Sequence, residues 1–137
     1  VFNNTVFCAD AGDRSGALLS SYSQERLNNW TFKNNIVVAA WSRPRPVLQT
    51  NRGVPEKMTV ENNIFINMRG VPQNNFEDIP PGLLREGEKP APFYLPADKS
   101  FVVDRGLDVG LPFKGTAPDM GALEQGEVWD LSSVPRP

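Results

Sequence analysis

Three short stretches of similar sequence recur along the chain, and they constrain its fold more than any other feature. They are residues 1–7 (VFNNTVF), 32–38 (FKNNIVV) and 60–66 (VENNIFI). Each contains an apolar residue, a variable residue, an Asn pair, a β-branched residue and two further apolar residues. The Asn pairs begin at positions 3, 34 and 62, so they are separated by 31 and 28 residues. A repeat of this period is typical of a stacked array of structural units.

The residues around each Asn pair alternate with period two. In the second copy one alternate set is Trp30, Phe32, Asn34, Ile36 and Val38. Period two with β-branched and aromatic residues predicts strands rather than helices. Asn is unfavourable in strands but tolerates a left-handed backbone. We therefore expect each Asn pair to form a bend between two short strands.

Stacking of the copies would explain why Asn recurs. If each repeat is one coil, equivalent strands lie about 4.8 Å apart, and Asn34 lies next to Asn62. Their amides would satisfy polar groups that are otherwise buried without partners, and the matching apolar positions would form files inside the coil. The sequence thus predicts an all-β parallel β-helix. An antiparallel β-sandwich with chance Asn-Asn turns is the alternative.

The composition changes after the third copy. Asn74-Asn75 lacks the downstream apolar pair, so we do not expect it to be a fourth copy. Frequent prolines from residue 77 onward preclude a long helix and central strands. Residues 1–75 have a charge balance of +3 and residues 76–137 one of −5. We expect residues 94–124 to close the core, because terminal units of stacked arrays are atypical.

Composition also limits the cellular context. No apolar run approaches the ~20 residues that cross a membrane, so no membrane span is expected. Cys8 is the single cysteine, which excludes an internal disulfide. The chain starts inside a strand motif, and an open coil end would expose unpaired backbone groups. We therefore interpret the chain as the C-terminal part of a longer protein, or as one chain of a cleaved protein.

A basic loop between the second and third copies is the candidate binding site. Residues 39–57 have a charge balance of +3 and include an aromatic side chain. Aromatic rings stack on sugars, and the guanidinium fork binds carboxylates. We predict an acidic polysaccharide as ligand, with Trp41, Arg43, Arg45 and Arg52 as substrate-binding residues. A solvated, Pro-stiffened loop is the alternative, and a chain pI near 5.1 argues against nucleic acid.

Residues 104–124 (DRGLDVGLPFKGTAPDMGALE) resemble the C-terminal end of secreted bacterial right-handed parallel β-helix proteins of the polysaccharide lyase-like, or pectate lyase-like, superfamily. In those proteins a D-x-G-x-D segment, a Pro/Gly link and A-P-D-(I/M)-G-A-x-E close the last coil. With the Asn pairs, the resemblance covers most of residues 1–124. It implies that 1–124 are the C-terminal coils and closing segment, with 125–137 as a tail or linker.

The resemblance also implies function and location. Many of these relatives cleave acidic glycans by β-elimination, and they are secreted, periplasmic or on the cell surface. We expect the C-terminal part of such a carbohydrate-active protein, most simply a polysaccharide lyase-like enzyme, or a glycoside hydrolase. A non-catalytic glycan-binding or structural surface solenoid is the alternative. No cofactor or metal site is expected in this chain, although calcium is possible in the full-length protein.

The resemblance assigns roles to the carboxylates and leaves the catalytic residues open. Asp104, Asp108, Asp119 and Glu124 are implied to be structural, with their carboxylates bonded to turn amides. A lyase base is Lys, Arg, His or Tyr, and the chain has no His. Lys33 has Glu61 as its counterpart, which predicts an unpaired side chain or an exposed ion pair of little energetic value. The catalytic residues are unknown, and if an active site exists we expect its main residues in upstream coils. The expected protein partner is the upstream part of the same β-helix or a partner chain.

Overall fold

The computed structural model describes residues 1–8, 17–21, 28–39, 42–50, 57–83 and 95–127. Within these residues the chain is all-β and has no helix. The described residues therefore contain no helix with the length and hydropathy of a membrane span. The strands are β1 (Thr5–Cys8), β2 (Leu19–Ser21), β3 (Thr31–Lys33), β4 (Ile36–Ala39), β5 (Arg45–Pro46), β6 (Leu48–Thr50), β7 (Thr59–Glu61), β8 (Ile64–Ile66), β9 (Met68–Arg69) and β10 (Phe76–Glu77).

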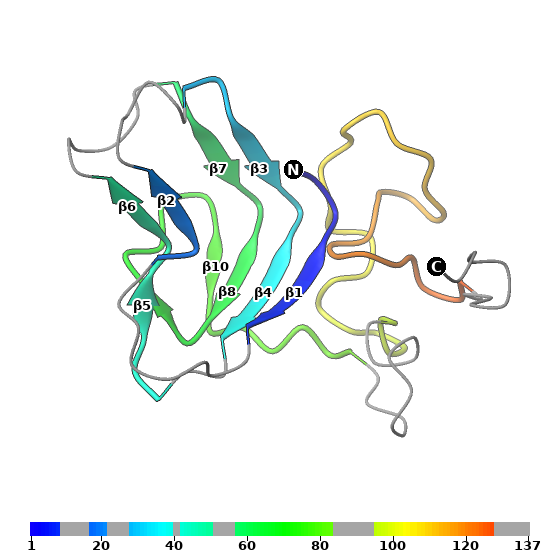
Figure 1. Ribbon diagram of the computed structural model, residues 1–137. Helices are drawn as coiled ribbons and strands as arrows, with labels where there is room; N and C mark the ends of the chain where they lie inside the picture. The colour runs from blue at the N-terminus through cyan, green and yellow to red at the C-terminus, as the bar shows by residue number, and fades with distance from the viewer. Residues whose placement is uncertain (9–16, 22–27, 40–41, 51–56, 84–94, 128–137) are drawn as a thin grey trace, which may run out of the picture.

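The labelled strands pair in parallel. The largest sheet has the order β1-β4-β8-β10, and three two-stranded sheets pair β2 with β6, β3 with β7 and β5 with β9. Figure 1 shows β3 and β4 as one bent path beside β7 and β8, with β2 and β6 on the other side of the core. The antiparallel sandwich alternative is therefore wrong for the described residues.

The register brings equivalent positions of the repeats together. Thr31 lies beside Thr59 in the β3–β7 pair, and Ile36 lies beside Ile64 in the β4–β8 pair. We call each Asn pair with its flanking residues a rung: rung 1 is 1–8, rung 2 is 31–39, rung 3 is 59–66 and rung 4 is 74–77. The predicted stacking of the three copies is confirmed.

Each Asn pair bends the backbone between two strands, as predicted. The first Asn of each pair has a positive φ: 48° for Asn3, 56° for Asn34, 54° for Asn62 and 63° for Asn74. Asn adopts this left-handed conformation at lower cost than most residues with a Cβ atom. The bend therefore explains why β3 stops at Lys33 and β4 starts at Ile36.

The second Asn of each pair forms a continuous file of hydrogen bonds. Asn35 Oδ1 accepts from the backbone N and Nδ2 of Asn4, both at 3.0 Å. Asn63 Oδ1 accepts from the same two atoms of Asn35, at 2.9 and 2.8 Å. Asn75 Oδ1 accepts from those of Asn63, at 3.0 and 2.8 Å. Asn35 and Asn63 have no exposed surface, so this file satisfies amides that water cannot reach.

The first Asn of each pair forms a second file, in which donation runs the other way. Asn34 Nδ2 donates to Asn3 Oδ1, and Asn62 Nδ2 donates to Asn34 Oδ1, both at 2.9 Å. In this file the amide donors point toward rung 1, whereas in the other file they point toward rung 4.

Asn74-Asn75 does form a fourth rung, so the expectation that it is not a further copy was wrong. Asn75 continues the file of second Asn residues, and Phe76 lies beside Ile64 in the β10–β8 pair. The chain returns to this position after only 12 residues instead of 28 or 31. Val71, in this short return, packs against the core, so it covers the stack at the rung 4 end.

The core has two parts, one on each face of the β1-β4-β8-β10 sheet. The inner cluster consists of Leu19, Phe32, Val37, Ala39, Val47, Phe65 and Met68. The outer cluster consists of Ile36, Ile64, Val102 and Met120. The expectation that all matching apolar positions lie inside the coil was therefore wrong. The left-handed Asn34 interrupts the pleat, so Phe32 faces inward while Ile36 faces outward.

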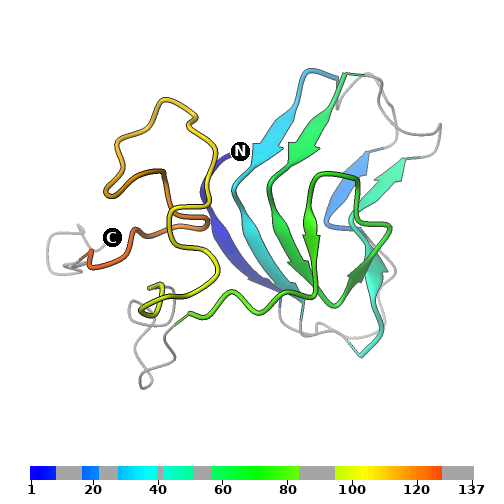
Figure 2. The ribbon, with the colours of Figure 1, turned by 180° about the vertical axis from the view of Figure 1, so that it is seen from behind.

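Residues 95–127, here called the side segment, cover the outer face of this sheet. Ala122 N donates to Thr5 Oγ1 in rung 1, and Gly121 N donates to the Asn34 carbonyl in rung 2. Phe101 packs edge-on against Phe76 of rung 4, with ring centroids 5.0 Å apart. Both views show the segment on the opposite side of the sheet from β2 and β6 (Figures 1 and 2). It lies along the side of the stack, where Val102 and Met120 pack on Ile36 and Ile64.

Candidate functional site

The predicted basic binding site lies only partly within the residues that the structure describes. Arg43 is exposed, and Arg45 is half-buried in β5. Trp41 and Arg52 lie outside the described residues, and so do Tyr22 and Tyr94, the two tyrosines of the chain and thus its possible tyrosine bases. The structure therefore places two of the four predicted binding residues, and the binding role of all four remains a prediction.

The parallel pairing of β5 with β9 adds one basic residue to this region. Arg45 lies beside Met68, and Pro46 lies beside Arg69, which is exposed. Arg45 and Arg69 thus lie on neighbouring strands, but they are one residue out of register, so their side chains leave the two strands on opposite faces. The sequence carries no signal for this proximity, because Arg45 comes 11 residues after Asn34 and Arg69 only 7 after Asn62.

Lys33 is paired with Glu61, as one of the two sequence-based alternatives predicted. Its Nζ lies 2.5 Å from Glu61 Oε1, and the two side chains are 26% and 32% exposed. The pair joins equivalent positions of β3 and β7. A partly solvated ion pair adds ~1 kcal/mol or less to stability, and the bonded ammonium is a poor candidate for a general base.

The carboxylates of the side segment accept hydrogen bonds from turn amides. Asp104 Oδ1 accepts from the backbone N of Thr116 and Ala117, at 2.7 and 3.1 Å. Both bonds lower the pKa of Asp104 below its usual value, and the bond from Ala117 has the larger effect. Asp108 Oδ1 accepts from Gly110 N at 2.8 Å. Both residues hold local turns together.

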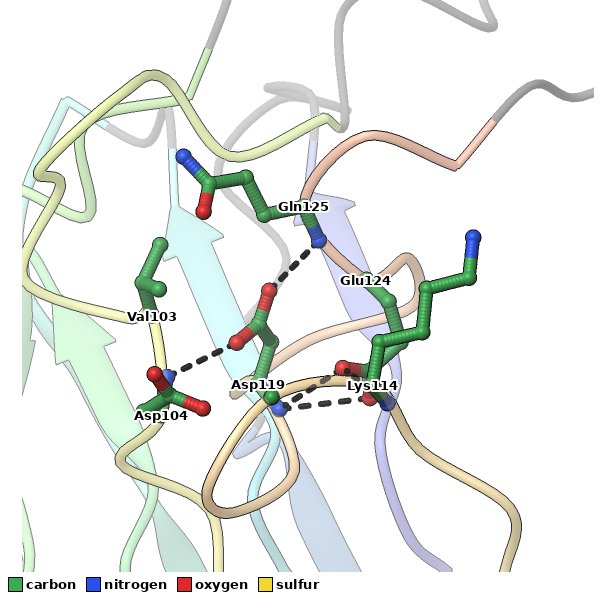
Figure 3. A pocket seen from close by; sticks show the side chains of 7 residues that line it. Val103, Asp104, Lys114, Asp119, Glu124 and Gln125 are labelled. Atoms are coloured by element: carbon green, nitrogen blue, oxygen red, sulfur yellow. Dashed lines mark hydrogen bonds between the residues drawn. The ribbon is translucent and has the colours of Figure 1, made fainter.

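Asp119 joins three parts of the side segment. It is 3% exposed. Its Oδ1 accepts from Asp104 N at 2.8 Å, and its Oδ2 accepts from Gln125 N at 2.6 Å (Figure 3). Each carboxylate oxygen is therefore committed to a backbone donor, which is how a buried carboxylate remains stable.

Glu124 lies next to Asp119 and has the opposite pKa shift to Asp104. Its oxygens accept from Asp119 N at 3.2 and 3.4 Å, and Oε2 also accepts from Lys114 N at 3.4 Å. Burial raises the pKa of Glu124, and the negative charges of Asp119 and Glu127 raise it further. The structural role implied for the four carboxylates is confirmed by these contacts.

A small pocket lies between these carboxylates. Its lining residues are Val103, Asp104, Lys114, Gly115, Asp119, Glu124 and Gln125, and its volume is about 80 Å³. Pockets for drug-sized ligands are usually roughly 300–1,000 Å³. Figure 3 shows the Lys114 side chain directed away from the Asp119 carboxylate. Among the described residues no group of three or more His, Cys, Asp or Glu could hold a metal ion. We infer that the residues lining this pocket stabilise the fold of the side segment.

The raised pKa of Glu124 predicts how the stability of the folded protein changes with pH. Its contribution to stability is full below the ordinary value of 4.5 and is lost as the pH rises through the folded-state pKa. Glu124→Gln removes this titration. The wild-type urea midpoint, measured relative to that of E124Q, should therefore fall as the pH is raised from about 4 to 7.

Asp104→Asn is the matched control for this measurement. The folded-state pKa of Asp104 is lowered, so its contribution is present above the ordinary value of 3.8 and is lost as the pH falls. The wild-type midpoint relative to D104N should change with pH in the opposite direction. A pH-independent difference between wild type and E124Q would contradict the assignment.

Comparison with known proteins adds no family assignment. No protein-family model, curated protein or solved structure matches this chain.

Proposed function

We propose that the chain forms coils of a right-handed parallel β-helix and belongs to a carbohydrate-active protein that acts on acidic glycans. The observation that carries this proposal is the register of the Asn rungs. Asn34 and Asn62 are hydrogen-bonded neighbours, and the strands on both sides of them pair in parallel. A coil that advances by one strand per repeat accounts for both facts, and parallel crossovers are almost always right-handed.

Binding of an acidic glycan fits the placement of the basic residues. Arg43 and Arg69 are both exposed, and Arg69 lies on β9, next to the strand that carries Arg45. A polysaccharide extended along the stack would meet side chains from successive rungs, and guanidinium groups bind uronate carboxylates through two parallel hydrogen bonds. Trp41, two residues before Arg43, would supply a ring for sugar stacking.

The reaction proposed is β-elimination. Cations neutralise the uronate carboxylate, which acidifies the proton on the adjacent carbon. A base removes that proton, a carbon–carbon double bond forms, and the glycosidic carbon–oxygen bond breaks as the leaving oxygen takes up a proton. In this scheme Arg43, Arg45 and Arg52 bind carboxylates, and the base belongs to coils outside this chain.

A non-catalytic glycan-binding solenoid is the second candidate. The specific observation that favours it is that the side chains that could act in catalysis make contacts that stabilise the fold. Lys33 is paired with Glu61, and Asp119 and Glu124 accept hydrogen bonds from turn amides. Incubation with polygalacturonate or alginate separates the two functions. The lyase releases unsaturated oligosaccharides with ultraviolet absorbance, whereas binding without such absorbance supports the solenoid and contradicts β-elimination.

Removal of the basic side chains should weaken glycan binding. We expect Arg43→Ala, Arg45→Ala and Arg52→Ala, combined, to lower the affinity for polygalacturonate about tenfold or more at low salt, because charge-assisted hydrogen bonds are lost. Calorimetry or affinity electrophoresis measures the change.

The matched control removes positive charge from the side segment. Lys99 and Lys114 are both exposed there, and the K99A/K114A variant should retain affinity within about twofold if binding is local to the basic loop. Equal losses in both variants would indicate unspecific attraction to a polyanion and would contradict the proposed site.

A further inference from the structure

Arg105 lies on the outer face of the β1-β4-β8-β10 sheet, where its guanidinium group stacks on an aromatic ring. Its Cζ atom is 4.4 Å from the centroid of the Phe101 ring. Phe101 in turn packs edge-on against Phe76 of rung 4, and both rings pack against the outer cluster. The ring beneath the guanidinium group is therefore held by the core of the stack.

The backbone that carries Arg105 is fixed on both sides of this residue. Asp104 N donates to Asp119 Oδ1 at 2.8 Å, and Gly106 N donates to a carbonyl of the same segment at 2.6 Å. The Arg105 carbonyl itself accepts from Asn62 Nδ2 at 2.8 Å, which connects it to rung 3. The fold therefore sets both the origin of this side chain and the ring on which it lies.

The positive charge of Arg105 is not neutralised by a carboxylate of the described residues. Arg105 is exposed, and its guanidinium group forms no ion pair within this part of the chain. The preceding residue, Asp104, accepts hydrogen bonds from turn amides through its carboxylate. Glu77 follows Phe76 in β10, and successive strand residues point to opposite faces of a sheet. Glu77 therefore leaves the sheet on the face opposite to the stacked rings.

Stacking occupies the face of the guanidinium group and leaves its edge free. All of its N–H donors lie in the plane of the group, so the Phe101 ring beneath it takes none of them. A ligand that binds a mobile side chain has to order it first, and this lowers the affinity. The contact with Phe101 orders Arg105 before a ligand arrives. The parallel donors of the free edge match the two oxygens of a carboxylate.

We propose that Arg105 is a second carboxylate-binding position of this protein, and that it binds a uronate carboxylate of an acidic glycan with its edge while its face stays on Phe101. The identity of the ligand rests on the proposed function. The position is separate from the basic loop, because β5, which carries Arg45, lies on the other side of the sheet from the side segment (Figures 1 and 2). The glycan therefore meets Arg105 on a surface of its own.

The probe is trigalacturonate, titrated into the 137-residue chain and followed by NMR of the arginine Nε–H groups. The Arg105 resonance is assigned by its absence in the R105K variant. We expect this resonance to shift as the trisaccharide binds, because a carboxylate joins the edge of the group. The methyl-esterified trisaccharide is the matched ligand control. It keeps the sugar rings but lacks the charged carboxylates, so it should leave the resonance unchanged.

A pair of variants measures the contribution to affinity. Both are made in the R43A/R45A/R52A background, which lacks the three arginines of the basic loop. Arg105→Lys keeps the charge and removes the planar fork, and we expect it to bind trigalacturonate about tenfold more weakly. Lys99→Ala removes another exposed positive charge of the side segment and should keep the affinity within about twofold.

Three outcomes would overturn the proposal. If R105K lowers the thermal midpoint but leaves the affinity unchanged, Arg105 only stabilises the side segment. If the Arg105 resonance stays in place with trigalacturonate while the wild type still binds polygalacturonate, Arg105 takes no part and the proposed function stands. If triglutamate shifts the resonance and trigalacturonate does not, the position belongs to an acidic peptide. Failure of the wild type to bind any of these glycans would contradict the proposed function together with this inference.

Discussion

Asn63→Ala is expected to lower the free energy of unfolding by about 4 kcal/mol, because a buried donor or acceptor left unsatisfied costs ~1–3 kcal/mol and several are affected. Asn63 Nδ2 donates to the carbonyls of Phe32 and Glu61, at 2.9 and 3.0 Å, as well as to Asn75 Oδ1. Its Oδ1 accepts both bonds from Asn35. Urea unfolding followed by tryptophan fluorescence measures the loss, provided that the slope with denaturant is unchanged.

The matched control is the same substitution in rung 1. Asn4 is exposed, so water replaces the bonds that Asn4→Ala removes, and a loss of roughly 1 kcal/mol is expected. The comparison holds residue type and position in the repeat constant, while both the burial of the Asn side chain and the number of its hydrogen bonds are lower in rung 1. Similar losses at the two sites would mean that the file of Asn amides contributes no more inside the stack than at its end.

Gly121→Ala is expected to lower the free energy of unfolding by about 3 kcal/mol, from ~1–3 kcal/mol of backbone strain and ~1–3 kcal/mol of overpacking. Gly121 has a φ of 101°, and its N–H donates to the Asn34 carbonyl. A Cβ atom there would lie 2.7 Å from Ile36 Cδ1 and 2.8 Å from Thr5 Oγ1. The side segment would have to move off the sheet, so the variant should unfold at a lower temperature than the wild type.

Two variants separate strain from crowding at this position. Gly126 has a φ of 70° and no atom within 4 Å of an added Cβ, so Gly126→Ala should cost only about 1 kcal/mol of strain. Ile36→Val removes the atom nearest to the added Cβ, so G121A should cost less in an I36V background than alone. Additive losses in this double-mutant cycle would rule out the contact as the cause.

The stacking of the Asn rungs could be predicted from the sequence, because both its signals are local. The Asn pair recurs at a near-constant spacing, and β-branched and apolar residues surround it at period two. The left-handed first Asn follows from the same pattern, since few other residues tolerate that backbone. The structural role of Asp104 and Asp119 followed from the resemblance of one continuous segment.

The features that could not be predicted from the sequence are those that local sequence patterns do not encode. Asn74-Asn75 forms a rung although it lacks the downstream apolar pair of the other copies and follows the third pair by only 12 residues. The outward direction of Ile36 depends on how much the left-handed Asn34 rotates the following strand. The position of the side segment depends on long-range contacts, such as that of Gly121 with Asn34, which hydropathy does not report.

The candidate binding site was predictable in composition but not in geometry. The aromatic and basic residues of the loop at 39–57 are evident in the sequence, whereas the proximity of Arg45 and Arg69 arises from the pairing of β5 with β9. This pairing joins positions that differ in their distance from the Asn pair, because the loops between rungs differ in length. The described rungs stay in register although the loops between them differ in length.

The opposed donation in the two Asn files has an electrostatic consequence. Each side-chain amide is a dipole, and a single file of aligned amides would build up a net moment with every added rung, as peptide units do in a helix. Because one file points toward β1 and its neighbour toward β10, the two moments oppose each other. An added rung therefore builds up less net moment than it would in a single file of aligned amides.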